Sequence, residues 1–557
     1  MGWRTGGLLV LAFGLLAPAS SAGGDDAISQ AIDHELPARM ARYDVPGAAV
    51  ALVRDGESVW SGAYGYADVK DSRRVTDETR FEAGSIAKPL TAWGIMVLVE
   101  DGRLNLDDPA VDHLPDDVAA RLDSVEYDPR EVTVEMLLSN SSGLPASIGI
   151  PGPDGFRSGE VDADALRLGR RPGEQFVYSN PGFVLAALII EEVSGQAYAG
   201  FMEERVLEPL GMHDSGFGAQ PRFEGRAATG YTFDGEPVAW REHGPLGAGG
   251  LYSTAEDLAR FVAATVSYGG GEAEGAGWGG GSAPAVGGGA GRAGGQEAGA
   301  SEEAAAARID AEPEFGARLP LSVESIKQLH TPCVPVSGAY HSLMSDSYAL
   351  GHFVETLSDG QPLLTHGGES GGWMAAFFAL PESGEGIVLL TNSRRSWALM
   401  ELVGLWTEEL GIVAPVMSQS FARLRAGVVA ITVLAGALAV GLLIAVGLQW
   451  SRGTRRPALF IQRALVERRG TPGSRRALAS GRAVPGPRRA LVLRGILLLL
   501  AVALAAGWWF LVHGIVAMFF PVLVGYPAVA VSLLAVTLFV MSGTVRVGAG
   551  RLLSSYE

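Results

Sequence analysis

Apolar and polar positions form several short runs with the pattern of β-strands. Residues 48–53 and 58–66 predict two strands joined by a tight turn at an Asp-Gly pair. Residues 374–380 and 386–390 predict a second pair around a Pro-Glu-Ser-Gly turn. A substantial part of the chain is therefore expected to be β-structure.

Other stretches follow the helical period of about 3.6 residues. Residues 91–100 predict a helix that ends at Gly102, and residues 183–193 predict a helix that ends near Gly195. Together with the strands, these helices predict an α/β fold for residues 28–411.

One segment fits neither pattern. Gly fills 15 of the 32 positions between residues 269 and 300, with Ala, Ser and Glu between them. Such a composition cannot bury enough apolar surface to offset the entropy lost on ordering. We interpret residues 269–306 as a disordered insertion in a surface loop, because candidate site residues fall on both sides of it.

The N-terminus has the layout of a secretory signal peptide over residues 1–22. Arg4 precedes an apolar run at residues 8–16, and small residues at 19–22 form a cleavage site. The alternative is an uncleaved N-terminal anchor. Under either interpretation, the chain from residue 25 onward is expected to be exported.

Apolar runs near the C-terminus are long enough to cross a bilayer. Residues 426–448 carry no charge and match a hydrocarbon core of about 30 Å. As a helix, the apolar stretch at 495–542 is over twice that thickness. We expect it to turn back near Pro521 and to form two spans, at 495–517 and 522–542.

The charge of the chain is divided unevenly. The 557 residues have a formal net charge of −18, yet residues 419–557 hold 16 Arg, no Lys and only 2 Glu. Within this basic part, the loop at 451–490 has 11 Arg and one acid, which places it in the cytoplasm by the positive-inside rule. We expect a multi-pass plasma (inner) membrane protein with an extracytoplasmic, periplasmic domain and a cytoplasmic tail at 543–557.

Composition also excludes several function classes. The strongly acidic part before residue 419 is unsuited to binding nucleic acid, which needs clustered Lys and Arg. The single cysteine, Cys333, excludes an intrachain disulfide framework, and the nine His show no metal-ligand spacing. We therefore expect no metal and no cofactor. The expected partners are a small-molecule or short peptide substrate and the lipid bilayer.

Ser85 and Lys88 are the first candidate catalytic residues. Their spacing places them one turn apart on one face at the start of the helix predicted at 91–100. A serine hydroxyl at a helix N-terminus is stabilised as it develops negative charge. A buried lysine loses its charge by desolvation and can then accept the serine proton.

Tyr178 and Asn180 lie just before the helix predicted at 183–193. A tyrosine beside a lysine can relay a proton, and an asparagine amide can steady the lysine and hydrogen-bond to a substrate carbonyl. Alone, a Tyr-x-Asn tripeptide also fits an ordinary loop.

His366 is followed by Gly367 and Gly368. On a strand beside a pocket, the glycines would let a substrate backbone approach closely, and a neighbouring N–H could donate to an oxyanion. Alone, a strand-end His with two glycines also fits an ordinary turn.

The order Ser-x-x-Lys, Tyr-x-Asn, His-x-Gly resembles that of the serine β-lactamase and penicillin-binding-protein superfamily. It is similar to the class C-like branch of D-aminopeptidases and esterases, the S12 peptidases. The similarity covers about residues 28–411 and implies an antiparallel sheet flanked by helices, with a helical subdomain and the site between them. Flanking segments share it, at 98–109, 133–138, 142–145, 209–212 and 249–254.

The resemblance assigns the reacting groups residue by residue. Ser85 is the nucleophile that forms an acyl-enzyme, and Lys88 and Tyr178 form the proton relay. Asn180 positions the substrate and the lysine. The backbone N–H groups of Ser85 and Glu369 form the oxyanion hole.

The resemblance also places His366 and Gly368 in substrate binding, and here the chain departs from the lactamases. His366 stands where lactamases of this branch carry a lysine. A histidine weakens the fixed positive charge that holds a β-lactam or D-Ala carboxylate. Peptidase or esterase activity is therefore favoured over β-lactamase activity.

We expect a membrane-anchored serine hydrolase of small amides or esters, of the D-aminopeptidase or prodrug-peptidase type or the D-Ala carboxypeptidase or esterase type. An exported domain followed by three spans also resembles the peptidases that remove an N-acyl-D-amino-acid cap from nonribosomal-peptide precursors. Two alternatives stay open: a penicillin-recognising membrane sensor that is acylated without turnover, and an inactive binding domain.

Overall fold

The structure is a computed structural model. It describes residues 24–122, 126–145, 166–218, 220–238, 246–267, 319–338, 341–396 and 400–420, with residues 423 and 427. The predicted signal peptide, Gly-rich insertion, basic loop and C-terminal tail lie outside the described residues, as do the three predicted spans apart from residue 427. Across the described ranges, no single helix has the length and hydropathy of a membrane span, although the bent pair Asn180–Ser194 and Tyr198–Leu207 passes that test jointly.

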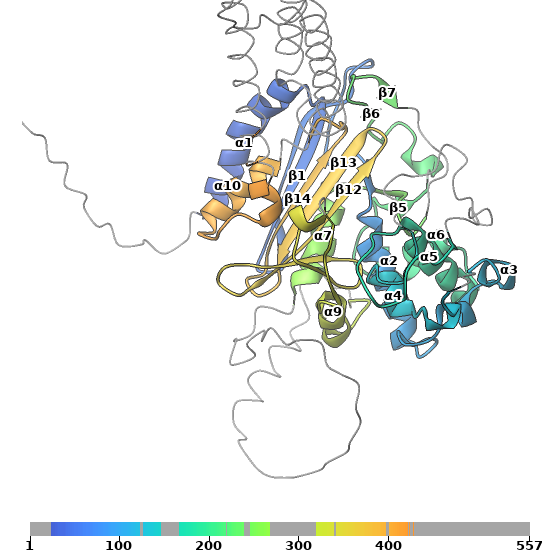
Figure 1. The fold of residues 1–557 in the computed structure, drawn as a ribbon. Helices are drawn as coiled ribbons and strands as arrows, with labels where there is room; N and C mark the ends of the chain where they lie inside the picture. The colour runs from blue at the N-terminus through green and yellow to red at the C-terminus, as the bar shows by residue number, and fades with distance from the viewer. Residues whose placement is uncertain are drawn as a thin grey trace, which may run out of the picture.

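A nine-stranded antiparallel sheet forms the centre of the fold (Figure 1). Its spatial order is β3-β2-β1-β14-β13-β12-β11-β10-β9, so the N-terminal hairpin pairs with the last strand of the domain. The strands in chain order are β1 Gly47–Arg54, β2 Glu57–Asp68, β3 Arg73–Arg74, β9 Val334–Pro335, β10 Ser347–Tyr348, β11 Phe353–Thr356, β12 Pro362–Ser370, β13 Trp373–Leu380 and β14 Glu385–Thr391.

The predicted strand pairs are present in this sheet. The predicted turn between β1 and β2 has positive φ at both central residues, 51° at Asp55 and 75° at Gly56, which suits the right-handed twist of a hairpin. β13 and β14 pair around the turn predicted between them. Each strand is one or two residues longer at an end than its apolar run predicts.

Both faces of the sheet are apolar and buried. Alternate residues of β1 point to opposite sides, so that Ala49, Ala51 and Val53 join one core cluster. Ala48, Val50 and Leu52 join the other. The sheet therefore needs a helical layer on each face.

Helices from the two ends of the domain cover one face of the sheet. α1 (Gly24–Tyr43) lies beside α10 (Glu401–Glu409), and an ion pair between Arg39 and Glu401 joins them (Figure 1). Their apolar side chains, such as Leu36 and Trp406, complete the core cluster of that face.

The opposite face carries α7 (Ala255–Val266) and a mainly helical region. The central element of that region is α2 (Ala87–Glu100), which is buried on all sides from Ala87 to Leu98, as expected of a helix that is apolar all round. Packed around it or near it are α3 Asp116–Ala119, α4 Val134–Leu138, α5 Asn180–Ser194, α6 Tyr198–Met202 and α9 Val323–His330.

A small second sheet contains β4, the strand that directly precedes α2 in the chain. It has the order β4-β8-β5, from Phe81–Gly84, Leu251–Ser253 and Gly216–Phe217. β4 packs against β12 and β13 of the large sheet. The start of α2 therefore lies at the junction between the sheet and the helices.

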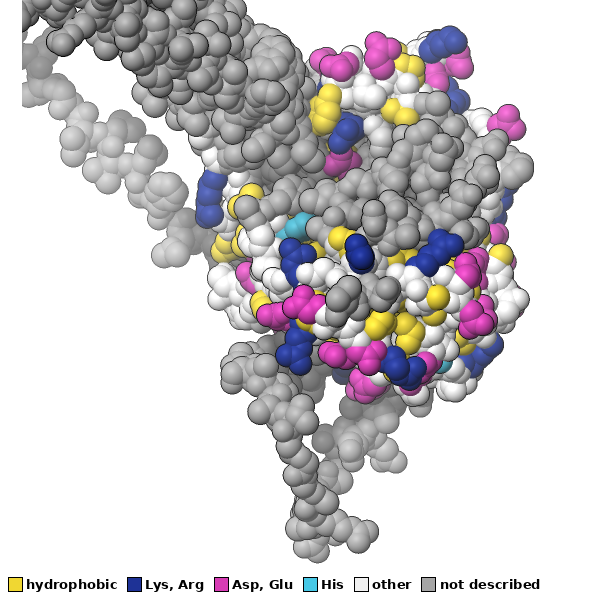
Figure 2. All heavy atoms as spheres, turned by 45° about the vertical axis from the view of Figure 1, so that its right-hand side comes forward, with side chains coloured by type: hydrophobic (Ala, Val, Ile, Leu, Met, Phe, Trp, Pro, Cys, Tyr) yellow, Lys and Arg dark blue, Asp and Glu magenta, His cyan; other side chains and the backbone are white. Residues whose placement is uncertain are grey.

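The surface of the domain carries mixed charge. On the face in Figure 2, Lys and Arg side chains stand beside Asp and Glu side chains rather than in a basic stripe. Exposed ion pairs of the helical region, such as Arg130 with Asp112, have the same mixed character.

A buried carboxyl group holds the last described helical turn to the sheet. Glu355 of β11 is 4% exposed, and both of its carboxylate oxygens lie 3.0 Å from the backbone N of Val416. Burial, with a smaller contribution from Asp346, raises the pKa of Glu355 to about 7. The segment that leads toward the predicted first span is thus attached through a group that titrates near neutral pH.

We predict that the wild-type protein loses stability between pH 5 and pH 8 and that Glu355→Gln removes this loss. The folded pKa lies above the usual carboxyl value of 4.5, so between these values the folded state binds more protons and stability falls as pH rises. The expected loss is on the order of 2 kcal/mol, and it is absent in the variant. The Tm of the full-length chain and of Glu355→Gln should be compared at both pH values; an equal pH dependence would contradict the assignment.

Candidate active site

Ser85 lies in the turn between β4 and α2. Gly84 has a φ of 52°, and the backbone N–H of Ile86 donates to the Ala83 carbonyl at 3.2 Å, so the chain reverses sharply before the helix begins. The Lys88 N–H donates to the Ser85 carbonyl at 3.0 Å. The half-buried serine hydroxyl therefore stands at the positive end of the helix dipole.

Lys88 is fully buried beside this serine. Its Nζ lies 3.0 Å from Ser85 Oγ and donates to the Ala248 carbonyl at 2.8 Å. The rings of Tyr178 and Phe183 cover it, with their centroids 4.9 and 5.6 Å from Nζ. Burial lowers the pKa of Lys88 well below its usual value, so the neutral amine can accept the serine proton.

Tyr178 is held against the site by aromatic contacts. Its ring stacks on His341 at 5.1 Å and on Phe353 at 6.3 Å. Because Lys88 Nζ lies under the same ring, the structure brings together Ser85, Lys88 and Tyr178, the three residues predicted to be catalytic.

Asn180 opens α5, whose N-terminus is capped by the Ser179 hydroxyl through the Gly182 N–H. The side chain of Asn180 is 6% exposed, and its Oδ1 has no hydrogen-bond partner among the described residues. An unpaired buried amide oxygen is costly unless a ligand pairs with it. The position suits an acceptor for a substrate N–H.

His366 is buried at 1% exposure on β12. Its Nδ1 lies 2.7 Å from the Gly367 carbonyl, which only accepts, so Nδ1 carries the proton. Nε2 then accepts from the Tyr348 hydroxyl at 3.3 Å. Burial, with a further contribution from Lys88, lowers the pKa of His366 well below its usual value, so this imidazole is neutral.

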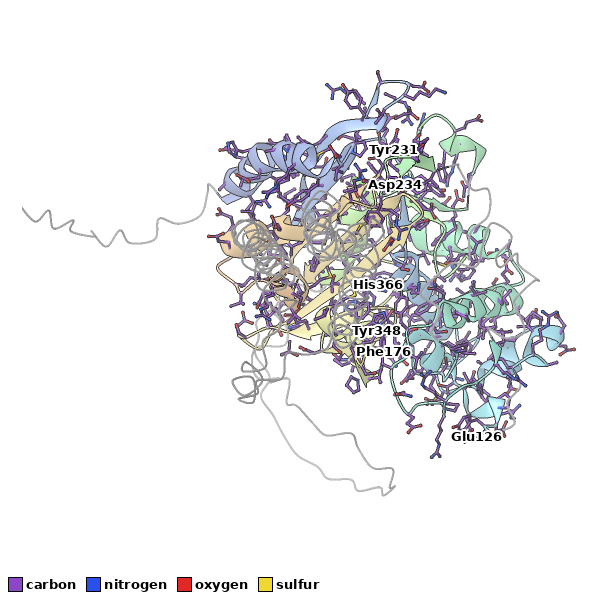
Figure 3. All side chains as sticks on the ribbon, turned by 45° about the horizontal axis from the view of Figure 1, so that its top comes forward. Glu126, Phe176, Tyr231, Asp234, Tyr348 and His366 are labelled. Atoms are coloured by element: carbon purple, nitrogen blue, oxygen red, sulfur yellow. The ribbon has the colours of Figure 1, made fainter. Side chains whose placement is uncertain are left out.

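Figure 3 shows Phe176, Tyr348 and His366 close together where the sheet meets the helices. The Phe176 and Tyr348 rings are 5.4 Å apart, and the Tyr348 and His366 rings are 6.2 Å apart. Because Nδ1 donates to the Gly367 carbonyl and Nε2 accepts from the Tyr348 hydroxyl, the neutral histidine offers a substrate no positive charge.

β4 and β12 approach each other through glycines at the predicted oxyanion hole. A Cβ on Gly368 would lie 1.9 Å from the Ala83 carbonyl oxygen and 3.1 Å from the Ser85 N. A Cβ on Gly84 would lie 2.8 Å from the Glu369 N. The backbone nitrogens of Ser85 and Glu369, the two predicted oxyanion-hole donors, therefore both border this contact.

Two parts of the site were missed in the sequence analysis. The Ala248 carbonyl that binds Lys88 lies next to a Gly-Gly pair, which was noted only as part of a flanking segment. Tyr348 and His341 lie in short elements without a periodic pattern that could mark them. Among the described residues, no group of three or more His, Cys, Asp or Glu side chains is placed to hold a metal ion.

The profile of the family described as Beta-lactamase matches residues 32–401. The chain belongs to this family. The match includes every residue of the candidate site, and it gives the chain the β-lactamase-like α/β fold with an antiparallel sheet and helices.

Solved structures agree with the β-lactamase fold. The octameric penicillin-binding protein homologue from Pyrococcus abyssi is 26% identical with a TM-score of 0.50, and the match covers 68% of this chain and 77% of that one. The crystal structure of SurE is 25% identical with a TM-score of 0.51, over 71% of this chain and 78% of that one.

Curated relatives match over shorter segments. "Protein flp" of Staphylococcus aureus (strain N315) is 29% identical over 216 residues, which is 37% of this chain and 41% of the relative. An uncharacterized protein of Mycobacterium tuberculosis (strain CDC 1551 / Oshkosh) is 31% identical over 227 residues, 36% of this chain and 56% of that protein. The chain thus matches about two-fifths to just over half the length of these curated relatives.

We predict that Gly368→Ala slows acylation of Ser85 by about 100-fold, because the new Cβ would collide with the Ala83 carbonyl and displace the nucleophile from the oxyanion hole. The rate is measured by labelling Ser85 with a fluorophosphonate. Gly200→Ala is the matched control, because a Cβ there meets nothing within 4 Å. Labelling of Gly368→Ala at the wild-type rate would overturn the assigned geometry.

Proposed function

We propose that this protein is a serine hydrolase that forms an acyl-enzyme on Ser85 and hydrolyses small amides or esters. The observation that carries the proposal is the distance of 3.0 Å between Ser85 Oγ and the Nζ of a fully buried Lys88. Burial keeps the pKa of this lysine low, which makes it a base near neutral pH.

The geometry suits acyl transfer in two steps. Lys88 Nζ takes the Ser85 proton as Oγ attacks the substrate carbonyl carbon, and the N–H groups of Ser85 and Glu369 stabilise the oxyanion. The proton then passes to the leaving amine or alcohol, with Tyr178 as the relay beside Lys88. Water hydrolyses the acyl-enzyme and restores the free serine.

The substrate class follows from the charge of the site. Within the Beta-lactamase family, we place the protein with the D-aminopeptidase and esterase branch, the S12 peptidases, rather than with the members that hydrolyse β-lactams. The neutral His366 supplies no cation for a β-lactam or D-Ala carboxylate. The unpaired Oδ1 of Asn180 suits a substrate that presents an amide N–H.

We predict that N-acyl-D-amino-acid amides or short acyl esters are hydrolysed faster than chromogenic β-lactams. The full-length protein is screened against these substrates and D-Ala-D-Ala peptides, with Ser85→Ala as the inactive control. Lys88→Met keeps the volume and apolar burial but removes the base, and it is expected to lower kcat by about 1,000-fold.

A β-lactam as the best substrate would refute this ranking. Lasting acylation without turnover would instead support the sensor alternative. Turnover that survives in Ser85→Ala would refute the proposed nucleophile.

We also propose that the hydrolase domain is exported and anchored by spans at 426–448, 495–517 and 522–542. The support is the apolar length of these runs and the Arg-rich loop between the first two. The prediction is that the protein stays with membranes after alkaline carbonate extraction, and that protease added to intact spheroplasts cleaves the domain but not the 451–490 loop. Release into the soluble fraction would contradict the anchor.

A further inference from the structure

The two halves of the oxyanion hole come from different sheets. The Ser85 amide follows β4, which pairs with β8, whereas the Glu369 amide lies on β12, which pairs with β11 and β13. These backbone ladders fix each strand within its own sheet and do not set the position of one strand relative to the other. An oxyanion hole needs its two donors placed to within about 0.5 Å.

The contacts at Gly84 and Gly368 limit how closely β4 and β12 approach each other. They do not fix the position of one strand along the other. The Cβ position of Gly368 would meet the Ala83 carbonyl, and that of Gly84 would meet the Glu369 backbone. Contacts of this kind are steric and non-directional. A directional interaction is needed to fix β12 along β4.

A buried hydrogen bond supplies that interaction. The Ser370 hydroxyl donates to Oε1 of Glu82 at 2.6 Å, and the two side chains are 5% and 9% exposed. Ser370 directly follows Glu369, and Glu82 precedes Ser85 by three residues. The bond thus crosses between the strands next to both donors of the oxyanion hole.

Glu369, the neighbour of Ser370 on β12, is held by a residue outside β4. The Glu369 carboxylate pairs with Arg394, which follows β14, so the Glu369 side chain is restrained toward the large sheet. Ser370 is the residue that ties this stretch of β12 to the nucleophile strand. A hydroxyl bound to a carboxylate in a site shielded from water is among the stronger hydrogen bonds.

We propose that Glu82 and Ser370 are a positioning pair that sets the distance between the Ser85 and Glu369 amides. Neither residue touches the substrate. The pair acts on the transition state, because the oxyanion forms only there, and substrate binding in the ground state depends on it little. The inference rests on the proposed hydrolase function.

The test compares Ser370→Ala with Ser370→Thr, which keeps a hydroxyl. We expect Ser370→Ala to lower kcat by 10- to 100-fold with KM changed less than threefold, and Ser370→Thr to restore most of kcat. Glu82→Gln keeps an acceptor oxygen and is expected to lower kcat by a smaller factor. The variant with both changes should be at most about twofold slower than Ser370→Ala, because both changes act on the same interaction.

A second readout separates positioning from loss of stability. Sulfur fits an oxyanion hole poorly, so the wild type should hydrolyse an oxo ester much faster than the matching thiono ester. In Ser370→Ala this ratio should fall several-fold toward one. Thr365→Val is the matched control, because it removes a buried hydroxyl bond of 2.7 Å from the same strand to the Phe377 carbonyl, away from β4.

The outcomes distinguish this inference from the proposed function. If the wild type shows no Ser85-dependent turnover, the proposed function fails. If the wild type turns over and Ser370→Ala leaves both kcat and the oxo-to-thiono ratio unchanged, only the positioning pair is refuted. If Ser370→Ala does not fold, Glu82→Leu, which removes the acceptor oxygens, carries the same test, and an unchanged ratio in that variant refutes the pair.

Discussion

The structure depends on excluding water from the amine of Lys88. Lys88 is fully buried in the first turn of α2, and its Nζ contacts one serine hydroxyl, one backbone carbonyl and two aromatic rings. No carboxylate forms an ion pair with it among the described salt bridges, so desolvation is the cause of its lowered pKa. A charged ammonium in this position would cost several kcal/mol, and the fold avoids this cost by holding the base neutral.

The architecture follows from that requirement. α2 must be covered on every side, which explains its apolar surface and its place between the large sheet and the helical region. The serine and lysine therefore come from one helix start, while Tyr178 and Asn180 come from the segment around the start of α5. The remaining donor of the site arrives on β12 from the other layer. The reaction site thus lies where the start of α2, the start of α5 and β12 meet.

Elements with a strong period could be predicted from the sequence, and the contacts between them could not. The hairpin of β1 and β2, the pair β13 and β14, and the helices α2 and α5 all lie where apolar spacing predicts them. The short strands β9 and β10 lack a pattern, and their place beside β11 depends on tertiary packing. The contact of His366 with Tyr348 could not be predicted for the same reason, because it depends on the pairing of β10, β11 and β12 in the sheet.

The neutral state of His366 and the basicity of Lys88 both follow from the burial of the two side chains. Burial lowers the pKa of both groups, and whenever Lys88 is protonated its charge lowers the pKa of the histidine further. A fixed cation at position 366 would need solvent or a counter-ion, and solvent near Lys88 would return the lysine toward its charged form. Tyr348 and the Gly367 carbonyl instead satisfy both imidazole nitrogens without charge. The same packing that makes Lys88 a base therefore leaves His366 without a charge.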